Sequence, residues 1–486
     1  MEMWIKDKAA TFGADYGESL KEWLAKYFNK VLTVKRTYCT EMVVTSEIAC
    51  VKSFCNLFDA LVLGFKQGEE ENRGDFLFYI EKWFVFCLIW SIGATVDEGS
   101  RREIDNILRD IEPMFPHSNT VYDHFIDQEK KDWTSWEQKI TSYKPIGKEF
   151  HEIIVPTVDT VRNRYLTQGL LNHGTSILLV GHSGVGKTVL VDQILLTLDQ
   201  NKISFTINFS AGTSSAGVQE IIESQFDRRA KNRFQPKGSK LKAVCFVDDL
   251  NMPKKETFGA QPPIELLRQW LDYGFWYDRS KVVKNYICNL QIMAAMGKPG
   301  GGRAHISERM LSKFHLINYT MPNEANLKRI FENLAIFKFH NFPEEIKALC
   351  EPLAVGSIQL FNSISEQFLP TPAKSHYVFN MRDISKVFQG LYMSQKANQD
   401  TKEHIVKLWG HEILRIFHDR LISVEDQNKL KGILNEQLQL HFQMDYKDHC
   451  MTKGETDAVF VDFLQNEDSS NYEEVTDFDK LRQYLL

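Results

Sequence analysis

The stretch Gly181-His-Ser-Gly-Val-Gly-Lys187-Thr188 decides the fold of this chain. It fits the pattern G-x-x-x-x-G-K-[ST], follows the apolar run Ile177–Val180 and opens a helix-like segment, Val189–Leu198. In this order the glycines let backbone N–H groups surround a β-phosphate, the lysine neutralises β- and γ-phosphate oxygens, and the threonine hydroxyl completes a Mg²⁺ shell. The helix N-terminus adds its own positive end. The stretch predicts a phosphate-binding loop; the alternative interpretation is an ordinary glycine-rich turn.

The residues expected to contact a nucleotide are those of the loop itself, and they are Gly181, His182, Ser183, Gly184, Val185, Gly186, Lys187 and Thr188.

A second run supplies the acids that such a loop requires. The apolar residues 243–247 end in Asp248 and Asp249. An acid at the end of another strand can hold Mg²⁺ together with Thr188, and the next acid stands where a general base would orient an attacking water. We therefore predict that Asp248 is a metal ligand and that Asp249 is the base. A surface acidic pair at the end of a strand is the alternative.

Short apolar runs alternate with helix-like stretches through the middle of the chain. The runs are Ser176–Val180, Ile203–Phe209, Ala243–Val247, Leu290–Ala295 and Phe314–Tyr319. Such alternation predicts an α/β fold with a five-stranded parallel sheet covered by helices.

The segments on both sides of this core have mostly helical patterns. A chain of 486 residues is long enough for roughly three compact units. We expect a helical region at 1–112, a connector at 113–150, the α/β core at 151–334, a helical lid at 335–434, and an acidic linker or the start of another unit at 435–486. The first helical region has the pattern of the end of a unit whose start is missing.

Composition narrows the class of protein. Hydrophobic residues make up 43% of the chain and the formal net charge is −6, with no basic stripe, so we expect no nucleic-acid partner. The eight cysteines show no C-x-x-C pairing, and Cys87, Cys245 and Cys288 lie in apolar runs. They are typical of small buried side chains in a reducing compartment, which points to the cytosol.

Targeting and membrane signals are not evident. The N-terminus lacks a charged start followed by an apolar core, so no secretory signal is expected. The most apolar stretch, Trp83–Ala94, is far shorter than the ~20 residues that a bilayer needs. We therefore predict a buried helix there and no membrane partner.

Longer motifs make a family resemblance specific. They are Asp248-Asp-Leu-Asn-Met-Pro253, Gly259-Ala-Gln-Pro-Pro-Ile-Glu-Leu-Leu-Arg-Gln-Trp270, Met296-Gly-Lys-Pro-Gly-Gly-Gly-Arg303, Ser375-His-Tyr-Val-Phe-Asn-Met-Arg-Asp383, and the shorter Trp90-Ser-Ile-Gly93, Ile154-Val-Pro-Thr-Val-Asp-Thr-Val-Arg162 and Leu408-Trp-Gly-His-Glu412. In these the chain resembles the third AAA+ module of axonemal dynein heavy chains. The resemblance covers most of the chain, and it implies the lid of the second module, the whole third module with its C-terminal helical lid, and the first residues of the fourth.

The resemblance implies roles for further residues. Lys187 and Thr188 match the Walker A pair and Asp248 matches the Mg²⁺ acid. Arg382 matches the sensor-II arginine that reaches the γ-phosphate, and Arg309 matches an arginine finger that serves the neighbouring module. Ile154, Val155 and Pro156 line the adenine pocket in this comparison. A solvated or salt-bridged surface residue is the alternative for each arginine.

The same resemblance implies cofactors, partners and a location. The cofactors are ATP or ADP and Mg²⁺. The partners are the neighbouring AAA+ modules of one heavy chain, with dynein intermediate and light chains and microtubules reached only through the full complex. The location is the cytoplasm and cytoskeleton, in the axoneme of a cilium. The implied function is regulation of ATP-driven movement along microtubules.

Two departures from a competent AAA+ site suggest slow ATP hydrolysis. Asp249 is one methylene shorter than the usual Glu, and a small misplacement of a base can cost ~100-fold in rate. Gly297 stands where other modules present a sensor-I Asn, so a polar contact to the attacking water is expected to be missing. Whether the site hydrolyses ATP stays open. An autonomous AAA+ remodelling or assembly factor and a nucleotide-stabilised scaffold are the alternative functions.

Overall fold

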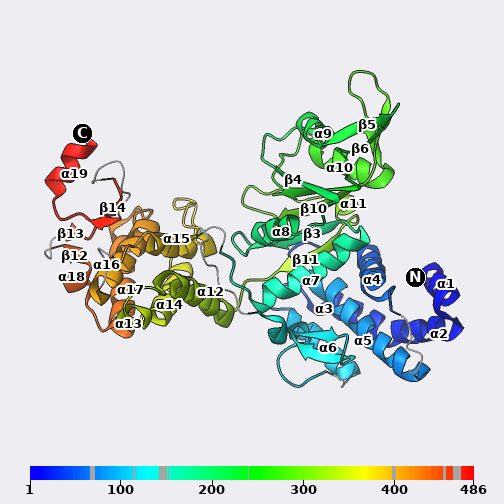
Figure 1. Cartoon of the computed structure of the whole chain (residues 1–486), viewed down its shortest axis with the longest axis horizontal. Helices are drawn as coiled ribbons and strands as arrows, with labels where there is room; N and C mark the ends of the chain where they lie inside the picture. The colour runs from blue at the N-terminus through cyan, green and yellow to red at the C-terminus, as the bar shows by residue number, and fades with distance from the viewer. Residues whose placement is uncertain are drawn as a thin grey trace. The chain divides into compact units, whose positions relative to one another are not determined.

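The computed structural model describes residues 1–65, 72–112, 115–141, 150, 153–238, 240–396, 401–452, 456–463 and 472–486. The chain divides into two compact units, one made of Met1–Ile140 with Val158–Met321 and the other of Thr141–Thr157 with Pro322–Leu486 (Figure 1). The predicted start of the core, His151, lies outside the described residues. The same is true of residues 113, 114 and 142–149 in the predicted connector 113–150.

The first unit contains the predicted parallel sheet. Its strands are β3 (Ile177–Gly181), β4 (Lys202–Asn208), β7 (Lys242–Asp248), β10 (Leu290–Met296) and β11 (His315–Tyr319). They lie in the order β11-β3-β10-β7-β4, and every neighbouring pair is parallel. The prediction of a five-stranded parallel sheet is therefore confirmed, and each strand coincides with one of the apolar runs to within a residue or two.

Helices cover both faces of this sheet. They are α7 (Val158–His173), α8 (Lys187–Leu196), α9 (Ser215–Glu223), α10 (Pro262–Tyr273) and α11 (Glu308–Leu311). Figure 1 shows α7 on one side of the strands and α9 and α10 on the other.

The two faces of the sheet belong to two separate hydrophobic cores. Successive side chains of a strand point to opposite faces. In β3, Ile177 and Leu179 pack into the core that contains the N-terminal helices, whereas Leu178 and Val180 pack into the core beneath α9 and α10. Because both faces are covered, β3, β7 and β10 are largely apolar, whereas the edge strand β4 alternates between polar and apolar residues.

The N-terminal helices form a layer of the same unit. They are α1 (Glu2–Phe12), α2 (Ala14–Trp23), α3 (Asn29–Tyr38), α4 (Glu47–Val62), α5 (Arg73–Ser91) and α6 (Arg101–Ile111), followed by the hairpin β1 (His124–Asp127) and β2 (Asp132–Ser135). In the described part of the chain, one helical segment, Arg73–Thr95, is long and apolar enough to cross a membrane, and 83% of its most apolar stretch is buried within the fold. Residues 83–94 are all buried, as expected for a core helix.

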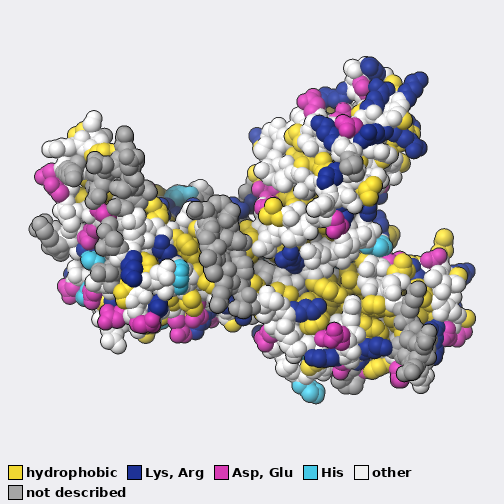
Figure 2. All heavy atoms as spheres, viewed as in Figure 1, with side chains coloured by type: hydrophobic (Ala, Val, Ile, Leu, Met, Phe, Trp, Pro, Cys, Tyr) yellow, Lys and Arg dark blue, Asp and Glu magenta, His cyan; other side chains and the backbone are white. Residues whose placement is uncertain are grey.

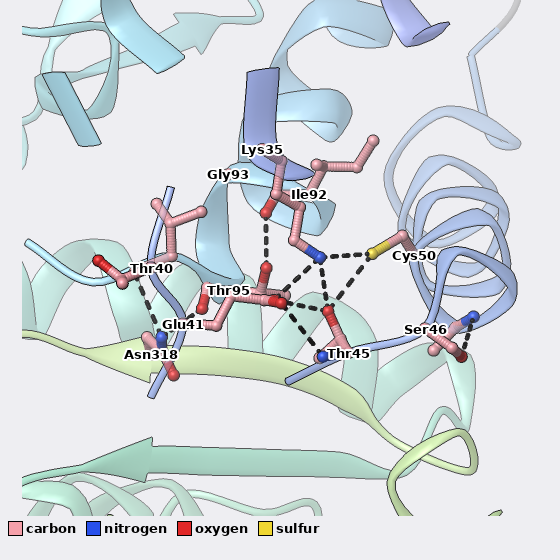
Figure 3. Close-up of polar contacts among 12 residues, drawn as sticks. Lys35, Thr40, Glu41, Thr45, Ser46, Cys50, Ile92, Gly93, Thr95 and Asn318 are labelled. Carbon is pink, nitrogen blue, oxygen red and sulfur yellow. Dashed lines mark hydrogen bonds and ion pairs between the residues drawn. The ribbon is translucent and has the colours of Figure 1, made fainter. Parts of the chain in front are cut away.

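Polar contacts join this helical layer to the edge strand β11. The ring Nε2 of His315 lies 3.0 Å from the carbonyl oxygen of Trp90. The side-chain amide of Asn318 donates to the carbonyl oxygens of Thr95 and Val96 (Figure 3). His315 and Asn318 are almost fully buried, so these contacts fix the helical layer against the sheet.

A buried ionic cluster links α3 to the start of α4 (Figure 3). The Lys35 Nζ lies 2.9 Å from Glu41 Oε1 and donates to Thr45 Oγ1 at 2.6 Å and to Cys50 Sγ at 3.2 Å. Burial alone would lower the pKa of Lys35, but its interactions with Cys50 and Glu41 outweigh burial and raise it. The lysine therefore stays charged and paired, which is a structural arrangement.

A second, four-stranded sheet was not predicted from the sequence. Its strands, in spatial order, are β5 (Phe226–Ala230), β6 (Arg233–Pro236), β9 (Lys284–Ile287) and β8 (Phe275–Tyr277). Exposed cations gather over β5 and β6, where Figure 2 shows Lys and Arg side chains. Arg228, Arg229, Lys231 and Arg233 belong to this group, so this segment, whose four cations lie within six residues, forms a basic surface that the sequence analysis did not predict.

The second unit is mainly helical. Its helices are α12 (Glu324–Phe339), α13 (Glu344–Lys347), α14 (Cys350–Gln367), α15 (Met381–Tyr392), α16 (Lys402–Ile413), α17 (Val424–Phe442), α18 (Tyr446–His449) and α19 (Phe478–Leu485), with the short strands β12 (Met451–Thr452), β13 (Thr456–Asp457), β14 (Phe460–Val461) and β15 (Glu473–Glu474). All eight cysteines of the chain lie in described segments and are free thiols.

Candidate nucleotide-binding site

The P-loop connects the buried strand β3 to helix α8. Gly184 and Gly186 adopt φ angles of 87° and 89°, a left-handed conformation that glycine reaches without steric cost. Gly186 is also the N-cap residue of α8, which begins at Lys187. The loop therefore leads directly into a helix N-terminus, where unpaired backbone N–H groups favour an anion.

The first glycine of the loop is required by a neighbouring strand rather than by its dihedral angles. Gly181 is the last residue of β3 and is paired with Tyr319 of β11. A Cβ atom added at Gly181 would lie 2.5 Å from the carbonyl oxygen of Tyr319. No larger residue fits there without separating the two strands.

Lys187 lies over the loop that it follows. Its Nζ donates to the carbonyl oxygens of Gly181 at 2.9 Å and His182 at 2.7 Å. Burial, followed by the nearby charges of Lys298 and Lys187, lowers the pKa of His182. The loop thus has a concentrated positive charge, which suits a polyphosphate.

Thr188 and Asp248 meet at the carboxyl ends of β3 and β7. The Thr188 hydroxyl donates to Asp248 Oδ2 at 2.7 Å, and the backbone N–H of Asp249 donates to Asp248 Oδ1 at 2.9 Å. Burial and the charge of Asp248 raise the pKa of Asp192, one turn further along α8. Hydroxyl and carboxylate oxygens side by side are the hard ligands that Mg²⁺ prefers, with water and phosphate completing the shell.

Asp249 forms the turn after β7. Its φ angle is 52°, in the left-handed region that Asp and Asn tolerate better than most residues. Its Oδ1 lies 3.7 Å from Nη2 of Arg303, and both side chains are partly exposed. The Asp249 carboxylate therefore follows directly after Asp248 in the chain and lies opposite the guanidinium of Arg303.

Lys187, Thr188, Asp248 and Asp249 are thus brought together in the first unit. Arg309 lies in the same unit on the short helix α11, with an exposed side chain.

The remaining predicted site residues belong to the second unit. Arg382 is exposed in the first turn of α15, whose N-terminus is capped by Asn380 and Asp383. Of the predicted adenine-pocket residues, Ile154 and Pro156 are partly buried and Val155 is buried. The Pro156 carbonyl oxygen accepts a hydrogen bond from Arg329 Nε at 3.1 Å. Their roles at a nucleotide stay predictions.

Sequence reasoning gave no role to Arg303. It ends the stretch Met296–Arg303, in which three consecutive glycines precede the arginine. Three consecutive glycines predict a tight turn, which can bring the following arginine back toward the start of the loop. This glycine run is the sequence signal from which the position of Arg303 could have been predicted.

The class of protein follows from this geometry. A P-loop after β3, an acid at the end of the non-adjacent strand β7, and the strand order β11-β3-β10-β7-β4 define a P-loop AAA+ nucleotide-binding domain. Three family models match the chain: "Dynein heavy chain AAA lid domain" at residues 20–138, "P-loop containing dynein motor region" at 143–322, and "Dynein heavy chain, ATPase lid domain" at 333–427. The chain belongs to the dynein heavy chain family.

Individual relatives are axonemal dyneins. The chain is 42% identical over 474 residues to "Dynein axonemal heavy chain 2" of Homo sapiens, with 96% of this chain and 10% of the relative covered. It is 39% identical over 520 residues to "Dynein-1-beta heavy chain, flagellar inner arm I1 complex" of Chlamydomonas reinhardtii, with 99% and 12% covered. The chain therefore spans about a tenth of the length of these curated relatives. These relatives place it in the cytoskeleton, in the axoneme of a cilium or flagellum.

These matches favour the dynein interpretation over an autonomous remodelling ATPase or a scaffold. They also confirm that the chain contains a nucleotide-binding dynein motor region with lid domains.

Proposed function

We propose that this chain contains the third AAA+ module of an axonemal dynein heavy chain, preceded by the lid of the second module, and that it binds ATP or ADP with Mg²⁺. The observation that carries the proposal is the hydrogen bond between Thr188 and Asp248, since it joins the P-loop helix to the acid of β7 in one oxygen-lined site. The domain limits 1–112, 151–334 and 335–434 belong to this proposal.

In the proposed site, the backbone N–H groups of residues 181–186 and the ammonium of Lys187 bind the phosphates. Thr188 and Asp248 hold Mg²⁺, which would neutralise charge on the phosphate oxygens. Ile154, Val155 and Pro156 contact adenine. Family resemblance supports these adenine contacts.

Asp249 orients the attacking water in this proposal, and Arg382 contacts the γ-phosphate. Arg309 serves the site of a neighbouring module. The short side chain of Asp249 favours slow turnover. The nucleotide would then set the conformation of adjacent modules of the same heavy chain rather than power movement directly.

The whole motor's activity is part of the same proposal. The names of the relatives support a role in ATP-driven microtubule-based movement of cilia, with other dynein chains and microtubules engaged only by the complete complex.

Titration of the chain with a fluorescent ATP analogue tests the proposal. Lys187→Ala removes a charge that pairs with phosphate, at a cost of roughly 2–4 kcal/mol, which weakens binding on the order of 100-fold. Lys242→Ala is the matched control, because this exposed lysine begins β7 at the opposite end of the strand from Asp248. Equal affinity of the wild type and Lys187→Ala would exclude the P-loop as the binding site.

A further inference from the structure

The loop after β10 emerges between the two halves of the candidate site. In the sheet, β10 pairs with β3 on one side and with β7 on the other, and all three strands are parallel. Their carboxyl ends therefore lie at one edge. The segment 297–303 starts between the P-loop, which follows β3, and the acids Asp248 and Asp249, which follow β7.

A tight turn brings Arg303 back over the start of this loop. Gly300 and Arg303 exchange backbone hydrogen bonds of 2.9 and 3.1 Å, and Gly300, Gly301 and Gly302 all have positive φ angles. A Cβ atom built on Gly297 would lie 2.6 Å from Nε and 2.8 Å from Cδ of Arg303. The arginine thus occupies the space that a side chain at position 297 would need.

This arrangement changes what was expected at Gly297. The sequence suggested that no polar side chain would be present at this sensor-I position. Instead, Arg303 supplies a guanidinium there, and Gly297 is the residue that makes room for it.

The Arg303 guanidinium is incompletely paired. Its Nη2 lies 3.7 Å from Asp249 Oδ1, beyond ordinary hydrogen-bond distance, and its buried Nε has no hydrogen-bond partner among the described residues. A buried donor without an acceptor is costly, and a planar guanidinium suits the oxygens of a phosphate. The group is thus available for a stronger acceptor than the one it contacts.

The loop also reaches the P-loop electrostatically. Lys298, on the same segment, contributes with burial and Lys187 to lowering the pKa of His182. Of the two cations on this loop, Lys298 thus acts on the P-loop through its charge, and Arg303 lies near Asp249.

We propose that Arg303 recognises the γ-phosphate of ATP in this site, and that it pairs with Asp249 when no γ-phosphate is present. The inference rests on the proposed nucleotide-binding function. Transfer of the guanidinium from Asp249 to the γ-phosphate would release the carboxylate of Asp249 at the moment when ATP is bound. Gly297 is required because any larger residue displaces Arg303.

Comparison of two ligands tests this inference. The wild type, Arg303→Ala and Arg303→Lys are titrated with ADP and with a non-hydrolysable ATP analogue, each with Mg²⁺. We expect Arg303→Ala to weaken binding of the triphosphate about 10- to 100-fold, as for the loss of a hydrogen bond to a charged group, and binding of ADP less than about twofold. Arg303→Lys should restore part of the difference.

Gly297→Ala gives an independent variant that leaves Arg303 in the sequence. It should reproduce the selective loss of triphosphate binding, whereas Gly64→Ala, whose Cβ would meet nothing within 4 Å, should not. Thermal denaturation of each variant identifies misfolded protein. Equal losses for both ligands, or no loss for either in Arg303→Ala, would overturn the role of Arg303. A wild type that binds neither ligand would overturn the proposed function itself.

Discussion

The hydroxyl of Thr188 donates a 2.7 Å hydrogen bond to Oδ2 of Asp248, a residue 60 positions later in the chain. Thr188 lies in the first turn of α8 and Asp248 ends β7, and only the parallel sheet brings them together. A divalent cation bound to a P-loop nucleotide needs an oxygen ligand from each of these two places.

Mg²⁺ should therefore tighten nucleotide binding through these two side chains. Thr188→Val and Asp248→Asn are each expected to reduce the Mg²⁺-dependent gain in ATP affinity by at least about 10-fold, because each removes an oxygen or a charge from the metal shell. Isothermal titration with Mg²⁺ and with EDTA measures the gain. Thr188→Ser keeps the hydroxyl and is the control; an unchanged gain in Thr188→Val would contradict the assignment.

ATP hydrolysis by the purified chain should be far slower than about one per second. Asp249 is one methylene shorter than the usual Glu base, and an arginine donated by another module contributes ~10³–10⁵ in related phosphoryl transfers. Single-turnover quench experiments measure the rate, with Lys187→Ala as the background. A rate near one per second that persists in Asp249→Asn would show that the base is assigned incorrectly.

Gly181→Ala should destabilise the first unit. The new Cβ would lie 2.5 Å from the Tyr319 carbonyl oxygen, so β3 and β11 must separate at a cost of about 1–3 kcal/mol. Urea denaturation followed by tryptophan fluorescence reports this unit, because all tryptophans except Trp409 lie in it. Gly212→Ala, which meets no atom within 4 Å, is the control. Identical unfolding midpoints for the two variants would argue against the close approach.

His315 should make the first unit less stable in mild acid. Burial lowers its pKa from 6.5 to about 4, although its contact with the Trp90 carbonyl partly opposes the shift. Below pH 6.5, His315 takes up a proton in the unfolded chain but stays neutral in the folded chain. The stabilising contribution is thus complete above pH 6.5 and is lost as the pH falls toward 4, by roughly 3 kcal/mol in all.

Urea denaturation of the wild type and His315→Gln at pH 5 and pH 7.5 tests this dependence. The variant should lose less stability than the wild type between the two pH values. His117→Gln, an exposed histidine of the same unit, should behave as the wild type. Equal pH dependence in all three proteins would mean that His315 does not carry the effect.

The nucleotide-binding loop, the acidic pair and all five strands of the parallel sheet could be predicted from the sequence. These features are local: Gly181 ends one apolar strand and begins the loop, and Asp248 ends another. Strands buried on both faces are continuous apolar runs, so their positions were visible without a structure. The family was also recognisable, because long motifs such as Met296–Arg303 are contiguous.

The tertiary structure alone decided the relationships between distant residues. The order of the strands places β10 between β3 and β7, and only a glycine turn returns Arg303 to the space over Gly297. The left-handed φ of Asp249 is another such feature; a Glu would tolerate it less well, which gives a backbone reason for the short acid. The glycine run before Arg303 predicts a turn, but strand order and the position of this turn beside the P-loop and Asp249 depend on packing between segments far apart in the chain, which no local pattern of residues encodes.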